Sequence, residues 1–269
     1  MAKIADILSL MRAFAPESET EPGFDDSVGL LVGSEKGDTA GALLCLDCTE
    51  RVIAEAAEKG YSLVISHHPA IFRGIKKVTD ETPTGRMILA AAKRGVSVYS
   101  AHTNLDFCEG GINDYAAELL GLSNVRPLLT EGTVAVGRTG ELAESMTAAR
   151  LAARCAAVFN DSRAAVAGDA DKKVKTVAVL CGGGGDIGFL EAAAAGGADC
   201  YITGDVPHHV ALYAAESGTP IVIVQHYAAE RIYIKRLGEV LARLAGERGV
   251  AARFEASESE RDPICKEDA

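Results

Sequence analysis

The chain has 269 residues, 48% of them hydrophobic and 24% charged, which is typical of a globular protein with a sizeable core. A net charge of −11 would repel a phosphate backbone, and no segment gathers basic residues with interleaved aromatics, so direct nucleic-acid binding is not expected. No apolar run reaches membrane-spanning length, and seven scattered cysteines, an odd number, indicate a reducing compartment. We therefore predict a cytoplasmic protein without a membrane partner.

The first predicted elements are a helix and a strand. Residues 1–14 carry apolar side chains at helical spacing, which predicts an amphipathic helix ending before Pro16 and not a signal peptide. Glycines then punctuate an apolar strand over residues 28–33, and Asp25 and Asp26 stand at its entry. These carboxylates could reach a binding site or cap a turn, and the composition of the segment favours the turn.

Strands and helices alternate over the next stretch. Strands are predicted at residues 41–46, 61–65 and 95–101, with helices beginning at Thr49 and Thr82 between them. This spacing implies right-handed crossovers and a parallel sheet, hence the α/β class.

Histidines follow two of these strands. His67 and His68 follow residues 61–65 after Ser66, and His102 comes after residues 95–101, four residues before Asp106. Ligands of open α/β sheets bind outside the carboxyl ends of the strands, so the adjacent imidazoles can turn into one pocket. The alternative is a solvated histidine pair in a loop.

Residues 126–175 differ in composition and in their pattern of predicted elements from the segments around them. They include an alanine-rich helix over residues 145–159, a charged turn over residues 168–173, and no histidine. We predict a small α+β insertion domain here that shapes an interface or a pocket wall. The remainder, residues 1–125 and 176–269, is predicted to form one discontinuous α/β metal-binding domain with two intertwined lobes.

The α/β pattern restarts after residue 175 and repeats the first half. Strands are predicted at residues 176–181, 199–203 and 220–224, with helices at residues 188–196 and 210–217. In each half one strand leads to a His-His pair and the next to a single histidine. All six histidines of the chain fall on this weak internal repeat.

The histidines and nearby acids suit a metal site. His226 and Glu230 lie four residues apart at the start of a helix, so both can project from one face toward one ion. With His67, His68 and Asp106 they offer three imidazoles and two carboxylates, which suit zinc, iron or manganese. Five ligands fit two divalent ions about 3.5 to 4 Å apart, bridged by a carboxylate such as Asp106.

Four further residues are candidates for orienting the ligands or for proton transfer: His102, His209, Asp47 and Asp205. An ordinary polar role in a loop is the alternative for each of them.

Several strings in the chain resemble the NIF-three-like family, whose members are also called GTP cyclohydrolase I type 2 homologues. They are residues 25–30, 66–69, 101–106, 203–205 with His209, and 226–227 with Glu230. The resemblance implies two intertwined α/β lobes, a ring-shaped hexamer, and a dinuclear metal site with His67, His68, Asp106, His226 and Glu230 as ligands. The chain departs from the family pattern in having Phe24-Asp25-Asp26 for Trp-Asp-Asn, and Gln225 for glycine.

Other motifs carry weaker signals. Residues 181–188 contain G-x-G-x-x-G between a strand and a helix, but their late position beside the histidines disfavours a dinucleotide. Gly183, Gly184 and Gly185 are instead predicted to hold a substrate phosphate with their N–H groups. Cys45 and Cys48 form one C-x-x-C without a second pair, so neither zinc nor redox chemistry is expected. The acidic run at residues 255–260 is predicted to be solvated.

Two classes of function remain open. One is a metal-dependent hydrolase of a nucleotide-like small molecule, in which a metal-bound hydroxide would open a purine at C8 with loss of formate, and His102 or His209 would shuttle protons. The other is a non-catalytic protein that stores or delivers metal, or a scaffold for partner proteins.

A homo-oligomer is also expected, because the apolar face of the N-terminal helix must be covered and the resemblance implies a hexamer. A ring would limit access to small molecules. Packing of that helix on its own subunit is the equal alternative.

Overall fold

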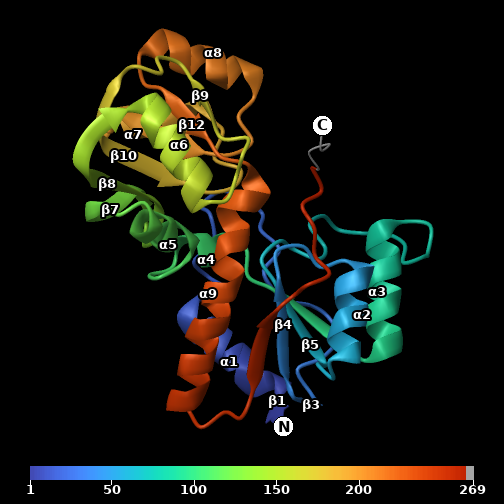
Figure 1. Cartoon of the computed structure of the whole chain (residues 1–269). Coiled ribbons are helices and arrows are strands. Elements are labelled where there is room, and N and C mark those ends of the chain that lie inside the picture. The colour runs from blue at the N-terminus through green and yellow to red at the C-terminus, as the bar shows by residue number, and fades with distance from the viewer. Residues whose placement is uncertain (265–269) are drawn as a thin grey trace. The chain divides into compact units, whose positions relative to one another are not determined.

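The structure, a computed structural model, describes residues 1–264 of the chain. Two compact units make up the fold (Figure 1). Among the described residues, unit 1 comprises residues 1–105 and 233–264, and unit 2 comprises residues 106–232. The chain passes between them within α4 (Thr103–Phe107) and within α9 (His226–Glu247). In the part described, no helix has both the length and the apolarity needed to cross a bilayer.

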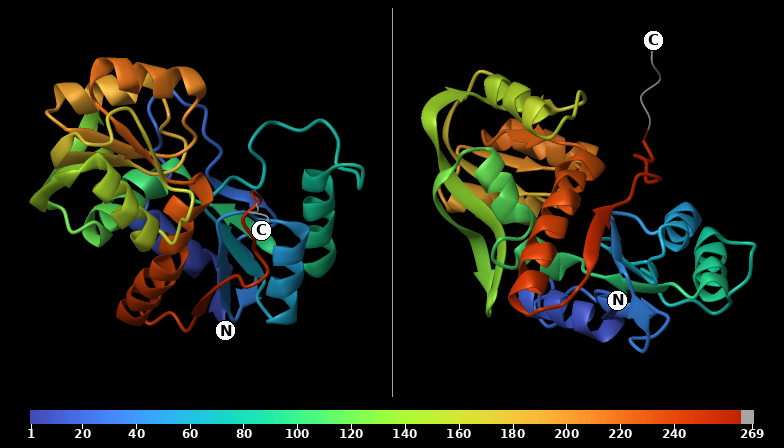
Figure 2. Two further views of the ribbon diagram at one scale, coloured as in Figure 1. Left: turned by 45° about the horizontal axis from the view of Figure 1, so that its top comes forward. Right: turned by 60° about the horizontal axis from the view of Figure 1, so that its bottom comes forward.

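Unit 1 is built on a five-stranded sheet in the order β13-β4-β5-β6-β2. Its strands are β2 (Gly29–Val32), β4 (Gly41–Cys45), β5 (Leu63–Ser66), β6 (Ser97–Ser100) and β13 (Arg253–Ala256). The strands β13, β4, β5 and β6 run parallel, and β2 is antiparallel to β6. Figure 2 shows β13 beside β4, where the end of the chain returns to the first sheet. The parallel sheet predicted from the alternation of strands and helices is confirmed.

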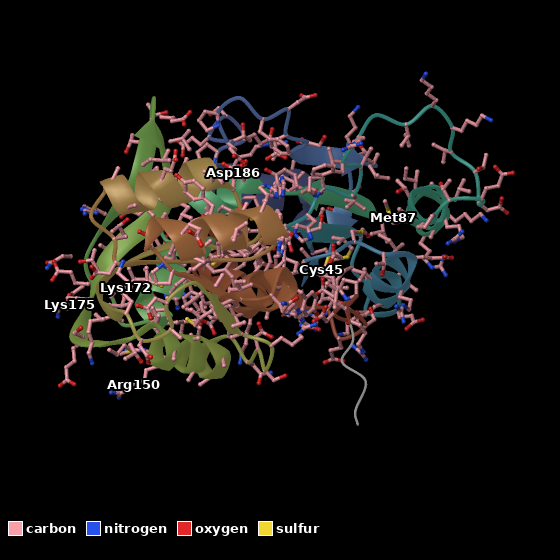
Figure 3. The ribbon with its side chains drawn as sticks, turned by 90° about the horizontal axis from the view of Figure 1, so that it is seen from above. Cys45, Met87, Arg150, Lys172, Lys175 and Asp186 are labelled. Carbon is pink, nitrogen blue, oxygen red and sulfur yellow. The ribbon has the colours of Figure 1, made fainter. Side chains whose placement is uncertain are left out.

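Helices cover both faces of this sheet. The helices α2 (Glu50–Glu58) and α3 (Pro83–Arg94) start at threonine caps, Thr49 and Thr82, whose side chains accept hydrogen bonds from backbone N–H groups. Their apolar residues pack on one face, in a core that includes Cys45 and Met87 (Figure 3). On the other face lie α1 (Ile4–Phe14) and the C-terminal part of α9 (Figure 1). A short pair, β1 (Ala2–Lys3) and β3 (Asp38–Thr39), lies beside α1.

The apolar face of α1 is covered within the chain. Ile7, Leu8, Leu10 and Met11 are fully buried. Of the two alternatives for this helix, packing on its own subunit is therefore the one observed, and α1 gives no argument for an oligomer.

Unit 2 is built on a six-stranded sheet in the order β7-β8-β10-β11-β12-β9. Its strands are β7 (Ser123–Glu131), β8 (Val134–Thr147), β9 (Ala165–Ala167), β10 (Lys173–Leu180), β11 (Cys200–Thr203) and β12 (Ile221–Ile223). The middle three, β10, β11 and β12, are parallel. The helices are α5 (Ile112–Leu119), α6 (Ala148–Val158), α7 (Ile187–Ala195) and α8 (His208–Ser217). Ala178 of β10, Tyr201 of β11 and Ile221 of β12 form a core with residues of α7 and α8.

The segment predicted as an insertion domain, residues 126–175, is part of this second sheet. Its long strand β8 pairs antiparallel with β10, and β9 pairs antiparallel with β12. The two α/β halves, predicted to share one domain, instead form separate sheets. The division drawn from the sequence therefore differs from that of the structure, because a sequence pattern shows strands but not which strands share a hydrogen-bond ladder.

The internal repeat is visible in the topology. In unit 1 the parallel strands β4, β5 and β6 are flanked by antiparallel β2, which precedes them in the chain. In unit 2 the parallel strands β10, β11 and β12 are flanked by antiparallel β9, which also precedes them. Each unit thus ends its middle strands at an edge where histidines follow, as ligand sites in open α/β sheets require.

Candidate metal centre

Three imidazoles gather at the carboxyl ends of β5 and β6 in unit 1. The backbone N–H groups of His67 and His68 donate to the carbonyls of Cys45 (3.0 Å) and Leu46 (2.9 Å), which extends the pairing of β5 with β4 and fixes both backbones. The ring centroids of His67 and His68 are 5.0 Å apart, and that of His102 lies 5.4 and 5.9 Å from them. The adjacent histidines therefore share one cluster with His102 and do not form a solvated loop pair.

Each of these rings is held through its Nδ1 by an oxygen acceptor. The pairs are His67 with the carbonyl of Ala101 (2.9 Å), His68 with Oδ1 of Asp47 (2.8 Å), and His102 with Oδ1 of Asp26 (2.7 Å). Because these oxygens accept, Nδ1 carries the hydrogen and Nε2 carries the lone pair in each neutral ring. This second hydrogen bond is typical of histidines that bind metals or transfer protons.

Asp26 has a role that the sequence analysis did not favour. Its carboxylate accepts hydrogen bonds from His102 Nδ1, from Thr103 Oγ1 (2.7 Å) and from the N–H of Thr103 (3.2 Å), besides the N–H of Ser27. Burial alone would raise the pKa of Asp26, but the hydrogen bonds from His102 and Thr103 lower it below its usual value. The preference for a simple turn was wrong, because the partners lie more than seventy residues away.

The acidic run near the C-terminus is only partly solvated. Glu260 is buried, and its Oε1 accepts from the N–H groups of Leu46 and Asp47, each at 2.6 Å. These N–H groups lie just past the end of β4, where the carboxylate satisfies them. Glu260 thus helps to place Asp47 and, through it, His68. The prediction of a solvated segment was wrong for this residue, since burial of an acid depends on donors from a distant loop.

In unit 2, an imidazole and a carboxylate lie one turn apart at the start of α9. His226 Nε2 lies 3.1 Å from Glu230 Oε2, as the four-residue spacing predicts, and its Nδ1 donates to Asp205 Oδ2 at 2.6 Å. Glu230 is only 3% exposed. Asp205 holds this position with a positive φ of 46°, which is uncommon outside glycine. Asp205 therefore orients His226 as Asp47 orients His68.

Gly182, which the sequence analysis did not single out, forms the wall beside this pair. Its φ is +76°, and a Cβ there would lie 2.0 Å from Glu230 Oε1 and 3.3 Å from His226 Nε2. Only glycine allows the backbone to pass so close to both side chains. The run of four glycines was the signal, but it was interpreted as a phosphate-binding turn.

The glycines predicted to hold a phosphate serve mainly packing. A Cβ on Gly184 would lie 2.6 Å from Tyr201 Oη, and one on Gly185 would lie 2.4 Å from the carbonyl oxygen of Asp205, whereas Gly183 faces open space. The side chain of Asp186 (Figure 3) caps α7 by accepting from the N–H of Gly188 at 2.7 Å. A carboxylate at this helix terminus would repel a phosphate, so the geometry does not support the predicted cradle.

Asp106 lies in unit 2, as Glu230 does, and both carboxylates are near the thiol of Cys181. Its carbonyl accepts from Asn113 Nδ2 (3.0 Å), and Asn113 Oδ1 accepts from the N–H of Cys181 (2.9 Å). Burial, with the charges of Glu230 and Asp106, raises the pKa of the Cys181 thiol well above its usual range, so Cys181 stays protonated. Two buried carboxylates, of which Glu230 lies beside an imidazole, are stabilised by a divalent cation, and this donor set fits one.

His209 is set apart from these groups. It is exposed in the first turn of α8, and within residues 1–264 its side chain has no hydrogen bond, ion pair or ring contact. Its predicted part in proton transfer therefore has no support from the geometry of unit 2.

The comparisons identify the family. The family model Duf34/NIF3 (NGG1p interacting factor 3) matches residues 2–263. The chain belongs to the Duf34/NIF3 family. A Clostridium acetobutylicum protein named GTP cyclohydrolase 1 type 2 homolog is 34% identical to it over 97% of both chains. The crystal structure of a Staphylococcus aureus hypothetical protein matches with a TM-score of 0.90 and 28% identity, covering 98% of this chain and 99% of that one. A Bacillus cereus protein related to NIF3 shares the fold, with a TM-score of 0.90 at 24% identity, covering 97% of this chain and 98% of that one.

The resemblance drawn from short sequence strings is thereby confirmed for the whole chain. In this Duf34/NIF3 protein each unit carries its own set of oriented donors at the carboxyl ends of its parallel strands. Unit 1 offers imidazoles, and unit 2 offers an imidazole with buried carboxylates. Both sets suit borderline divalent metals.

Proposed function

We propose that this protein is a metal-dependent hydrolase that acts on a nucleotide-like small molecule. The observation that carries the proposal is the anchoring of four imidazoles, those of His67, His68, His102 and His226, each through Nδ1 to an oxygen. A solvated loop histidine needs no such anchor, whereas a metal ligand or proton carrier does. The name GTP cyclohydrolase 1 type 2 homolog, given to relatives about one-third identical, supports the nucleotide class.

The proposed ligands are His67, His68, Asp106, His226 and Glu230, holding two divalent ions of zinc, iron or manganese. The donor chemistry of each unit and the family membership support this set. When bound, such ions supply activated water at neutral pH and polarise the electrophilic group of a substrate.

The residues around the ligands have separate roles in this proposal. Asp47 and Asp205 keep His68 and His226 in the tautomer that presents Nε2. His102, held by Asp26, accepts or returns a proton at its Nε2. Exposed His209 has no role in the proposed mechanism.

A turnover assay tests the proposal directly. The metal-loaded protein is incubated with a panel of nucleotides that includes GTP, and formate and ring-opened products are measured before and after removal of the metals. We expect turnover that requires metal. Hydrolysis that continues in metal-free protein would contradict the hydrolase proposal, and a loaded protein inert toward the whole panel would favour metal storage or a scaffold.

The ligand assignment has its own test. Purified protein should contain close to two metal ions per chain by elemental analysis. Asp106→Ala should lose both ions, because in this proposal Asp106 would be a ligand of each, whereas the matched control His102→Ala should keep them. Equal loss in both variants would place His102 among the ligands and overturn the assignment.

We also propose that the protein is cytoplasmic and forms a homo-oligomer, a hexameric ring by the resemblance to the family. Closed symmetry is the usual arrangement of soluble homo-oligomers. Light scattering coupled to size exclusion measures the mass directly. A monomer that persists at micromolar concentrations would contradict the ring.

A further inference from the structure

Two exposed aromatic rings stand at the edge of the histidine cluster in unit 1. The centroids of Phe24 and Phe72 are 6.0 Å apart, and they lie 6.2 and 6.1 Å from the centroid of His102. Phe24 is 39% exposed and Phe72 is 50% exposed. The three rings form a surface that we call the aromatic platform, and it is continuous with His67 and His68 through His102.

This placement is unusual for phenylalanine. Single exposed apolar residues are common on protein surfaces, but here two rings touch each other and an imidazole that Asp26 holds in place. Ligand sites combine aromatic walls with a few oriented polar groups, and the platform beside three anchored imidazoles has this composition. The exposed faces of the rings can stack on a planar ring of a ligand.

The loop that carries Phe72 also carries positive charge. Arg73, Lys76 and Lys77 follow within five residues and are exposed, in a chain whose net charge is −11. Cations concentrated beside the aromatic rings favour a ligand that joins a planar ring to an anionic group. A nucleotide has both parts.

We propose that Phe24 and Phe72 form a base-stacking subsite that selects ligands with a planar heteroaromatic ring linked to a phosphate. This inference rests on the proposed function, because it names the part of a nucleotide substrate that the residues beside the histidine cluster of unit 1 recognise. The two phenylalanines act in binding and specificity and take no part in proton transfer.

The absence of tryptophan from the chain makes a direct test simple. Phe24→Trp creates a single-tryptophan protein that keeps an aromatic ring on the platform, and Ile75→Trp places the same reporter at an exposed position of the Phe72 loop as a control. Guanosine 5′-monophosphate and ribose 5-phosphate serve as probes that differ only in the base. We expect the nucleotide to quench the emission of Phe24→Trp saturably, and ribose 5-phosphate to cause no quenching. Ile75→Trp should respond to neither probe.

Calorimetry on the metal-loaded protein measures the contribution of the rings. The double variant Phe24→Leu with Phe72→Leu should raise the Kd of guanosine 5′-monophosphate by about tenfold, within the range known for base stacking on aromatic side chains, and leave that of ribose 5-phosphate unchanged. Both residues are exposed, so the double variant should keep its fold and metal content.

Four results would overturn the subsite. The first two concern the wild type: equal affinity for the two probes, or no binding of the nucleotide. The other two concern the double variant: an unchanged nucleotide Kd, or dissociation of the oligomer, which would assign the rings to contact with a second copy of the chain. These binding measurements do not depend on turnover. If the nucleotide binds through its base but the turnover assay finds no hydrolysis, the proposed hydrolase activity is wrong and the subsite still holds.

Discussion

Replacement of Gly182 by alanine should weaken metal binding although it removes none of the proposed ligands. The new Cβ would lie 2.0 Å from Glu230 Oε1 and 3.3 Å from His226 Nε2, at a backbone φ of +76°. Glu230 is 3% exposed, so its carboxylate has little room to withdraw. The substitution therefore acts on the position of a proposed ligand and leaves its chemistry intact.

The size of the effect follows from this geometry. Carbon and oxygen atoms that are not bonded need at least about 3 Å, so the carboxylate oxygen must move by roughly 1 Å. Displacements of this size, like the loss of a group that orients a ligand, cost about 10- to 100-fold in metal affinity or activity. The left-handed backbone adds about 1 kcal/mol to the cost in folding stability.

Competition with a chelating indicator measures the metal affinity, and circular dichroism reports whether the variant is folded. Gly183→Ala is the matched control, because a Cβ there meets nothing within 4 Å and its φ is not positive. Glu230→Gln should weaken binding on its own, and Gly182→Ala should add little to it if both act on the same carboxylate. A folded Gly182→Ala protein with wild-type affinity would refute this reasoning.

Three further predictions concern stability, proton transfer and thiol reactivity. Burial would raise the pKa of Glu55, but hydrogen bonds from residues 257–259 lower this pKa from 4.5 to about 2. The stability that ionised Glu55 confers is therefore present above pH 4.5 and is lost as the pH falls toward 2. Urea unfolding of Glu55→Gln should thus show a deficit of roughly 3 kcal/mol at pH 6 that disappears near pH 2, and a pH-independent deficit would contradict the assignment. Asp26→Asn should reduce any metal-dependent turnover by about 100-fold, because His102 loses its charged anchor, while the metal content stays unchanged. A loss of metal in proportion to the loss of turnover would show that Asp26 has a structural role instead. In native protein at pH 8, iodoacetamide should modify half-exposed Cys48 and spare Cys45, because burial raises the pKa of the Cys45 thiol. Detection of label on both cysteines by peptide mass spectrometry would argue against this.

Much of this protein was predictable from its sequence, because local patterns decide local structure. Alternating β-branched strands and capped helices predicted both sets of parallel strands. The position of the histidines just after these strands predicted that they lie at the carboxyl ends of the sheets. The four-residue spacing of His226 and Glu230 predicted that the two side chains meet on one helix face. These features depend on the periods of helix and strand, which any short window of sequence contains.

The tertiary structure alone decided the partners that lie far apart in the chain. Asp26 reaches His102, Glu260 reaches the end of β4, and Gly182 passes beside Glu230, although none of these pairs is close in sequence. The pairing of β8 with β10 placed residues 126–175 in the second sheet for the same reason. Hydrogen bonds and close backbone approaches of this kind depend on how the elements pack, and no periodic pattern along the chain encodes which distant group will satisfy a buried donor or acceptor.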